Sequence, residues 1–264
     1  MTKQETIITK VANERLGETV LQNCGEIAYI VEYVDSKNIT VQFKTSGELV
    51  KTKYDVFVRG KIKSHFTPSV FGVGTTGLEP IKNESGEKLD SYVCWNDMLK
   101  RCYSAKYQEK HPTYKGCSVC DEWLYYPNFK KWHEANYYEI DNKTSQLDKD
   151  ILIKGNKIYS PETCIFVPQF INNLFTKRQK TRGTLPIGVC YYKASKKYKA
   201  SLSVFKNGKK ASKHLGYFDT ADEGFEAYKK AKEDYIKEVA DNYKDKIPVE
   251  LYEAMCNYSV SIND

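Results

Sequence analysis

The pattern that most restricts the fold lies in the C-terminal third of the chain. Three short segments that each contain aromatic residues follow one another, and Asn207-Gly208 between the last two is a strong hairpin signal. Thr220 with Glu223 three residues later forms a capping box, which predicts the start of a long amphipathic helix. We therefore expect a three-stranded antiparallel sheet with one face on this helix and the other face free. The predicted strands are at about residues 187–192, 197–205 and 210–218.

Positive charge is concentrated in the same part of the chain. Residues 163–218 contain twelve Lys or Arg and no Asp or Glu, although the net charge of the 264-residue chain is only +7. Several cations on one surface release counterions from a phosphate backbone, so the segment favours a nucleic-acid partner. An ordinary solvated face is the alternative interpretation of these charges.

The N-terminal region has a different pattern. Short apolar segments broken by turns predict a small antiparallel β-barrel. The next segment, residues 64–88, is rich in Gly and Pro and predicts a linker or an irregular connection. The predicted strands of the barrel are residues 19–21, 28–34, 39–43, 49–50 and 56–58.

The middle of the chain changes to helical spacing. Aromatic and apolar residues recur at helical intervals from Ser91, and Pro127 opens a second helix. Residues 146–177 then predict two short strands and a helix, a ββα unit. The expected fold class is α+β with several domains. These are a barrel at 1–66, the ββα unit with its aromatic helices at 67–178, the sheet module at 183–246 and a tail at 247–264.

The cysteines and the hydropathy of the chain indicate what kind of cellular environment to expect. Only Cys117 and Cys120 of the eight cysteines have metal-ligand spacing, and no matching second pair follows them. We therefore expect reduced thiols rather than structural zinc. The N-terminus is polar and no run of about eighteen apolar residues occurs, so neither a secretory signal nor a membrane span is expected.

Leu-Gly-Tyr-Phe-Asp-Thr at residues 215–220, before a helix that contains Ala227-Tyr228, resembles the ethylene-response-factor (APETALA) type of DNA-binding domain. In that family the sheet lies in the major groove of double-stranded DNA. The guanine-reading arginines of the plant proteins are largely absent here, so the resemblance implies DNA binding more than a sequence preference. With the lysines around these positions, the candidate DNA-binding residues are Tyr192, Lys193, Lys197, Lys199, Ser201, Ser203, Lys209, Lys210, Ser212, His214 and Tyr217, and Cys190 also falls on a DNA-facing position.

The central region resembles phage-encoded HNH endonucleases of the homing type, in which a nuclease unit precedes a module of this kind. The resemblance rests on Trp95, Met98, Trp123, Trp132 and the motifs at residues 101–103, 114–117, 147–152 and 159–164. It implies a mobile-element protein in the cytoplasm of a bacterial host, with monomer as the default state.

The HNH resemblance also implies roles for four candidate catalytic residues. Asp148 and Asn172 stand at the metal-binding positions, where they would hold Mg²⁺ or Mn²⁺ for phosphodiester cleavage. Lys149 replaces the catalytic His, and Thr163 replaces the Asn that orients it. The implied activity is metal-dependent nicking of DNA, weakened or lost because of these replacements.

Two other functions stay open from the sequence. The first is a DNA-binding regulator without catalysis, which the missing histidine favours. The second is a phage inhibitor that acts on host defence through a protein or nucleotide target. For that role the predicted N-terminal barrel is the main candidate.

Overall fold

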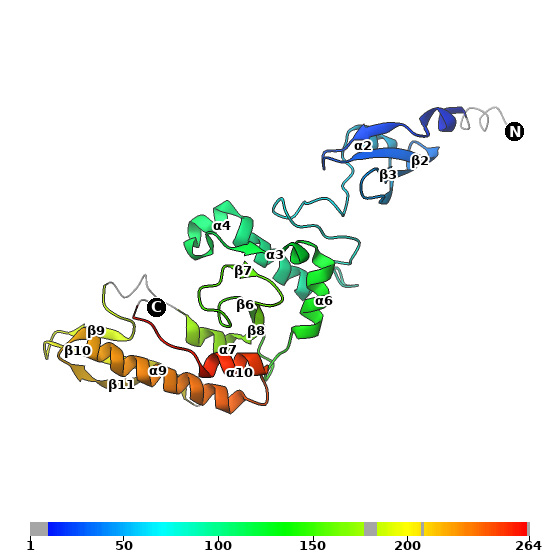
Figure 1. The fold of residues 1–264 in the computed structure, drawn as a ribbon. Coiled ribbons are helices and arrows are strands. Elements are labelled where there is room, and N and C mark those ends of the chain that lie inside the picture. The colour runs from blue at the N-terminus through cyan, green and yellow to red at the C-terminus, as the bar shows by residue number, and fades with distance from the viewer. Residues whose placement is uncertain (1–9, 177–183, 207–208, 263–264) are drawn as a thin grey trace. The chain divides into compact units, whose positions relative to one another are not determined.

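The computed structural model describes residues 10–176, 184–206 and 209–262, apart from the side chains of Lys206, Lys209 and Lys210. Its contacts divide the chain into two compact units. The first runs to Ala135 and includes Lys157–Ser160, and the second comprises Asn136–Asn156 and the chain from Pro161. Helices and antiparallel sheets occur together, so the predicted α+β class is confirmed (Figure 1).

The N-terminal sheet is open. Its strands lie in the order β1-β2-β3-β4, and each pairs antiparallel with the next. Alternate side chains such as Ile30, Val41 and Phe43 point into a core that also includes Phe57. The predicted closed barrel is wrong, because β1 and β4 are the edges of this sheet and no closed barrel occurs in the described residues. The strands are β1 (Thr19–Leu21), β2 (Ile27–Asp35), β3 (Asn38–Phe43) and β4 (Leu49–Thr52).

The strand predicted at residues 56–58 is instead part of a short helix, α2 (Tyr54–Val58). Phe57 is buried and Tyr54 is half-buried, which is helical rather than alternating spacing. Gly60, at φ +67°, ends this turn, and its N–H donates to the Phe57 carbonyl over 2.9 Å. The strand was predicted because Val56 and Val58 are β-branched. Without this strand, the predicted barrel has no element to close it.

The first unit also contains the aromatic helices, as the helical spacing predicted. Trp95, Trp123, Tyr126 and Phe129 are fully buried there, and Trp95 Nε1 donates to the Trp123 carbonyl over 2.6 Å. β5 pairs in parallel with β7. The elements are α3 (Asp90–Tyr103), α4 (Ala105–Lys110), η1 (Pro112–Tyr114), β5 (Ser118–Val119), α5 (Asp121–Leu124), α6 (Tyr126–Asn136) and β7 (Ile158–Tyr159).

The second unit begins with the predicted ββα order. β6 and β8 form an antiparallel pair, and a short helix follows β8 directly. The C-terminal sheet has the order β11-β10-β9, also antiparallel, and α9 packs against it (Figure 1). The elements are β6 (Ser145–Asp148), β8 (Ile165–Pro168), α7 (Gln169–Asn172), η2 (Asn173–Phe175), β9 (Val189–Tyr192), β10 (Lys197–Lys206), β11 (Lys209–Phe218), α9 (Ala221–Tyr243) and α10 (Val249–Cys256).

Helix α9 takes part in two cores of the second unit. Near its start, Phe225 and Tyr228 pack against Leu202 of the sheet. Near its end, Ile236 packs in a cluster that includes Ile171 of α7 together with residues of α10. The predicted tail thus contains a helix that packs on the ββα unit, and α9 supports both this unit and the sheet.

Candidate nucleic-acid interface

The central strand of the C-terminal sheet, β10, has one face on α9 and one face away from it. Tyr198, Leu202 and Val204 belong to the core cluster that contains α9 side chains. Successive side chains of a strand point to opposite faces, so Lys197, Lys199, Ser201 and Ser203 point away from the helix. We call the face that carries these four residues the outer face.

The strand register adds residues from both neighbouring strands to the outer face. Directly paired residues of antiparallel strands share a face. The register between β10 and β11 shifts by one residue after Ala200. Ala200 pairs with Gly216, and Ser201 then pairs with His214. The added residues are Cys190 and Tyr192 of β9, paired with Lys199 and Lys197, and Ser212, His214 and Tyr217 of β11, paired with Ser203, Ser201 and Lys199.

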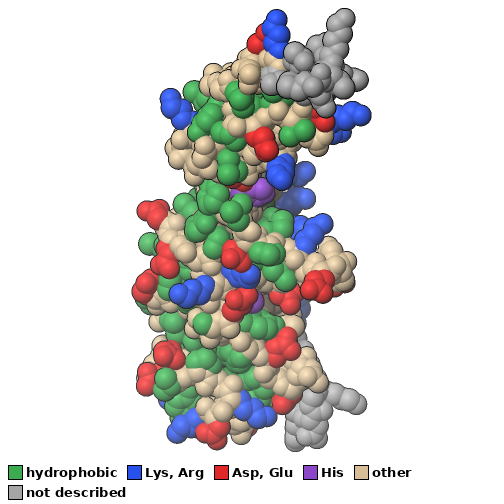
Figure 2. All heavy atoms as spheres, turned by 90° about the vertical axis from the view of Figure 1, so that its right-hand side faces the viewer, with side chains coloured by type: hydrophobic (Ala, Val, Ile, Leu, Met, Phe, Trp, Pro, Cys, Tyr) green, Lys and Arg blue, Asp and Glu red, His purple; other side chains and the backbone are tan. Residues whose placement is uncertain are grey.

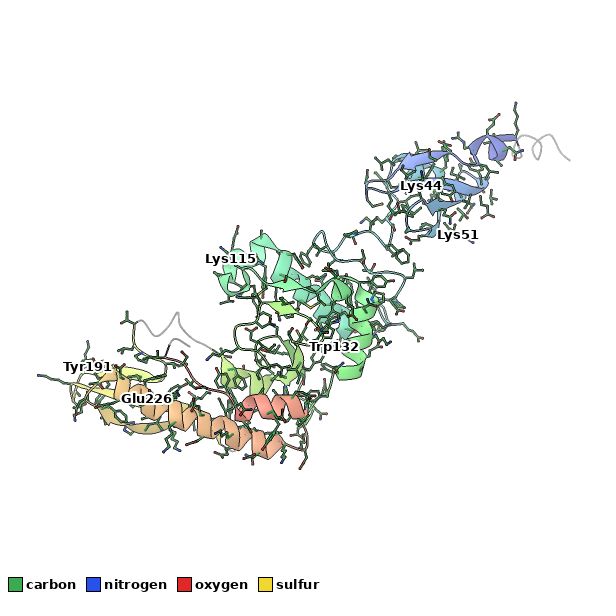
Figure 3. All side chains as sticks on the ribbon, in the orientation of Figure 1. Lys44, Lys51, Lys115, Trp132, Tyr191 and Glu226 are labelled. Carbon is green, nitrogen blue, oxygen red and sulfur yellow. The ribbon has the colours of Figure 1, made fainter. Side chains whose placement is uncertain are left out.

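An aromatic row crosses the outer face. The rings of Tyr192 and Tyr217 lie 5.3 Å apart between centroids, and the ring of His214 lies 4.9 Å from that of Tyr217. Tyr192 is 43% exposed and Tyr217 is 44% exposed, so both rings are accessible to a ligand. Tyr191, which pairs with Tyr198, lies on the opposite face of the same strand (Figure 3).

The lysines on and beside the outer face differ in whether an acid opposes them. Lys199 forms no ion pair with any described residue, and neither does exposed Lys193 in the turn after β9. Lys197 Nζ lies 3.0 Å from Asp219 Oδ1. The side chains of Lys209 and Lys210, also predicted to bind DNA, lie outside the described residues. By contrast, acidic and basic side chains are intermixed on the view of the molecule in Figure 2.

Two local devices fix the helix behind this face. The predicted capping box is confirmed, since Thr220 Oγ1 accepts from the Glu223 N–H and Glu223 Oε2 accepts from the Thr220 N–H, both over 3.2 Å. Gly188, at φ +79°, lies against the Tyr228 ring so closely that a Cβ there would come within 2.0 Å of Cδ2. The sheet and α9 can approach this closely only because residue 188 has no side chain.

In the ββα unit, Asp148 caps the turn that follows β6. Its Oδ1 accepts hydrogen bonds from the N–H groups of Asp150 and Ile151, each over 2.8 Å. Burial raises the pKa of Asp148 above its ordinary value, and the two backbone hydrogen bonds only partly oppose this. One oxygen of the predicted metal ligand is therefore already used to hold the backbone.

Lys149, which the resemblance places where a catalytic His would stand, is a buried residue with 6% exposure. Its ammonium group contacts the Asp150 carboxylate and donates to the Asn156 carbonyl over 2.8 Å. The Asn156 side chain donates back to the Lys149 carbonyl, also over 2.8 Å. Lys149 and Asn156 thus tie both ends of the loop after β6 together. The sequence gives no signal for this role of Asn156.

The other two predicted site residues lie near β8. Asn172 Nδ2 donates to Gln146 Oε1 over 3.1 Å, and Gln146 precedes Asp148 by two positions on the same face of β6. Thr163 is half-buried two residues before β8. The fold thus brings Asn172 to the side of β6 that carries Asp148, and the Asn172 amide nitrogen is held by Gln146.

These residues offer few free oxygen atoms to a divalent cation. Mg²⁺ binds several oxygen ligands in near-octahedral geometry. Here Asp148 Oδ1 accepts backbone hydrogen bonds. The next residue, Lys149, carries a positive charge. Within the described ranges, no cluster of three His, Cys, Asp or Glu side chains could hold a metal ion. The predicted Mg²⁺ or Mn²⁺ site therefore stays a prediction from the resemblance.

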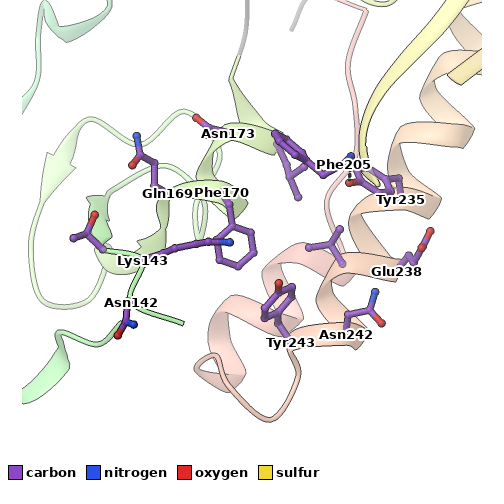
Figure 4. A pocket seen from close by; sticks show the side chains of 13 residues that line it. Asn142, Lys143, Gln169, Phe170, Asn173, Phe205, Tyr235, Glu238, Asn242 and Tyr243 are labelled. Atoms are coloured by element: carbon purple, nitrogen blue, oxygen red, sulfur yellow. Dashed lines mark hydrogen bonds between the residues drawn. The ribbon is translucent and has the colours of Figure 1, made fainter. Parts of the chain in front are cut away.

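A groove of about 700 Å³ separates the ββα unit from the second half of α9 (Figure 4). Carboxamide side chains of Asn142, Gln169 and Asn242 line it beside the rings of Phe170 and Tyr243, whose centroids lie 4.8 Å apart. The sequence analysis missed this groove, because its walls come from segments about a hundred residues apart. Most of its polar residues are solvent-exposed.

Comparison with models of known protein families, with curated proteins and with solved structures finds no match for this chain. Across the described residues, no helix is both long and apolar enough to cross a membrane.

Proposed function

We propose that this protein binds double-stranded DNA through the outer face of the C-terminal sheet, and that its ββα unit is a structural support without nuclease activity. The strand register carries the proposal. It gathers Lys197, Lys199 and the aromatic row on one face, while α9 covers the other face. The groups gathered there are those that contact DNA, because lysines bind phosphates and hydroxyls reach sugars and base edges.

Shape supports the same partner. The major groove of B-DNA is wide enough for a two-stranded β-ribbon. β10 and β11 pair over nine positions, from Tyr198 with Phe218 to Lys206 with Lys209, so they form a ribbon of this kind. The small side chains of Ser201, Ser203 and Ser212 along it would allow close approach to base edges.

The contacts of Lys149 support the absence of catalysis. A general base must accept a proton near the reacting group, which an ammonium group can do only after it loses one of its own. The Lys149 ammonium is instead held by the Asp150 carboxylate and the Asn156 carbonyl oxygen. This geometry suits a structural crosslink of the loop.

The test is a titration of a fluorescent DNA duplex over a series of salt concentrations. We expect Lys197→Gln with Lys199→Gln to weaken binding about tenfold or more. The slope of log K against log salt should fall by about 1 to 2, because each lost phosphate contact removes about 0.9. The lower figure applies if Asp219 already neutralises Lys197.

The matched control is Lys44→Gln with Lys51→Gln, which removes the same charge from two exposed positions of the first unit, the turn after β3 and strand β4 (Figure 3). It should bind like the wild type. If both variants lost the same DNA affinity, the effect would come from net charge alone. If the wild type bound no DNA at low salt, the proposal would be refuted.

A further inference from the structure

A second basic surface lies in the first unit, on residues 100–115, which form the end of α3, α4 and η1. We call it the α4 surface. Its only carboxylate is Glu109. Lys157 joins it, because Lys157 Nζ donates to the Thr113 carbonyl over 2.8 Å. The cations within the segment are Lys100, Arg101, Lys106, Lys110 and Lys115.

Arg101 is a half-buried cation without a carboxylate partner among the described residues. Its guanidinium lies 5.6 Å from the centre of the Tyr114 ring and forms a hydrogen bond with Tyr159. Burial lowers the pKa of Arg101, but the tyrosines raise it by a larger amount. The net effect is a raised pKa, so the guanidinium stays charged. A planar guanidinium held by aromatic rings and not neutralised by an acid is suited to a phosphate group.

The exposed lysines of the α4 surface are also unopposed. Lys106, Lys110 and Lys115 are solvent-exposed and form no ion pair with any other described residue. Lys100 differs, since its Nζ lies 3.7 Å from Asp97 Oδ1 and 5.1 Å from the centre of the Tyr107 ring. Three lysines are therefore available to a ligand.

Aromatic rings lie among these cations, as on the outer face of the sheet. Tyr107 and His111 are stacked, with centroids 4.3 Å apart, and the Tyr114 ring lies 5.9 Å from Tyr107. Gln108 fixes the segment that carries them, because its Nε2 donates to the Cys102 carbonyl over 2.7 Å and to the Tyr114 carbonyl over 3.3 Å. The rings and cations are thus held on one ordered segment.

We infer that the α4 surface is a second DNA contact, which binds the phosphate backbone outside the stretch occupied by the C-terminal sheet. This inference rests on the proposed DNA binding and extends it to the first unit. Two contacts on one polyanion make the second binding event intramolecular, so affinity rises without a new base contact. The α4 surface supplies phosphate binding and no sequence readout.

The test compares Lys106→Gln, Lys110→Gln and Lys115→Gln, combined in the full-length chain, with a control that carries Lys44→Gln, Lys51→Gln and Lys53→Gln. All six positions are exposed, and both variants lose the same charge. The α4 variant should bind a long duplex at least tenfold more weakly at physiological salt. Its salt slope should fall by up to about 2.7, at about 0.9 for each lost contact. Its footprint should lose one flank and keep the tract protected by the sheet.

The outcomes separate this inference from the proposed function. If the wild type and the control bind DNA and the α4 variant matches them in slope and footprint, the second contact is refuted while binding by the sheet stands. If the wild type binds no DNA, the proposed function fails and the inference with it. Arg101→Lys provides an independent check. It keeps the charge but loses the planar donor pair, so we expect weaker binding with an almost unchanged salt slope and an unchanged footprint.

Discussion

Two lysines of the second unit show how surroundings decide what a cation does. Lys149 follows β6, is 6% exposed, and contacts the Asp150 carboxylate and the Asn156 carbonyl. Lys199 lies on the outer face of β10 and forms no ion pair with a described residue. The first lysine closes a loop, and the second is available to a ligand. A residue type at a family position therefore does not fix a role until its hydrogen bonds are known.

The largest effect should come from the support of the outer face. Gly188→Ala would place a Cβ 2.0 Å from Tyr228 Cδ2 at a φ of +79°. We expect it to lower the free energy of unfolding by about 2–5 kcal/mol, from overpacking together with the left-handed backbone. DNA binding should be lost with the sheet. Urea unfolding and duplex titration measure the two effects.

The matched control for Gly188→Ala is Gly155→Ala in the loop of the ββα unit. Gly155 has a similar φ of +83°, but a Cβ there would meet nothing within 4 Å. Its cost should be only the backbone term of about 1–2 kcal/mol, with DNA binding retained. Equal effects at the two glycines would contradict the close packing of sheet and helix.

Lys149→Ala should be the next largest change, with an effect on stability alone. It leaves the Asn156 carbonyl and the Asp150 carboxylate without this partner, which should cost about 1–3 kcal/mol of unfolding free energy. The folded variant should bind DNA as the wild type does, whereas Lys199→Ala should keep its stability and bind more weakly. Lys237→Ala, at an exposed position of α9, serves as the control. If Lys149→Ala kept the stability of the wild type but lost DNA binding, Lys149 would be the lysine that serves the ligand, contrary to this account.

Tyr217→Leu removes one ring from the aromatic row. We expect a several-fold loss of DNA affinity with an unchanged salt slope, because a tyrosine carries no charge and releases no counterion. Tyr191→Leu is the control, since Tyr191 is exposed on the same sheet but faces away from the row. If Tyr191→Leu weakened DNA binding as much as Tyr217→Leu, the outer face would not be the binding surface.

The smallest effect concerns pH and Asp148. Burial raises the pKa of Asp148 in the folded chain, so its ionised form opposes folding above that pKa. This penalty disappears as the pH falls through the folded pKa towards the unfolded value of about 3.9. Asp148→Asn should therefore be slightly more stable than the wild type at pH 7, and the difference should shrink as the pH falls towards about 3.9. Urea midpoints at the two pH values give the measurement.

Asp150→Asn tests the sign of that argument. The Asp150 carboxylate contacts the Lys149 ammonium, so its neutralisation should lower stability at pH 7, opposite to Asp148→Asn. A loss of stability in Asp148→Asn at pH 7 would mean that the fold favours the charged carboxylate, and it would reopen the question of a metal ligand there.

The sequence predicted best what local signals determine. The capping box at Thr220, the three strands of the C-terminal sheet and the ββα order depend on turn residues and on periodicity within short segments. The strand register and the alternation of β10 then bring the outer-face residues together. The sharing of α9 between two cores depends on distant contacts and could not be read in this way.

The errors arose where short apolar segments had two interpretations or where partners were remote. Val56 and Val58 are β-branched and favour a strand, but the segment is buried in the pattern of a helix. Only packing against the N-terminal sheet decides between the two. The hydrogen bonds between Lys149 and Asn156 join positions seven residues apart across a turn, which no periodic pattern signals. The groove beside α9 has no sequence signature, because its walls come from separate segments.

The most direct test of the account is incubation of the purified protein with supercoiled plasmid, with and without Mg²⁺ or Mn²⁺, followed by gel electrophoresis. The open outer face and the closed contacts of Lys149 predict retarded plasmid that remains supercoiled whether metal is present or absent. Metal-dependent conversion to nicked circles that disappears in Asp148→Ala would contradict the account, because it would make the ββα unit an active nuclease site.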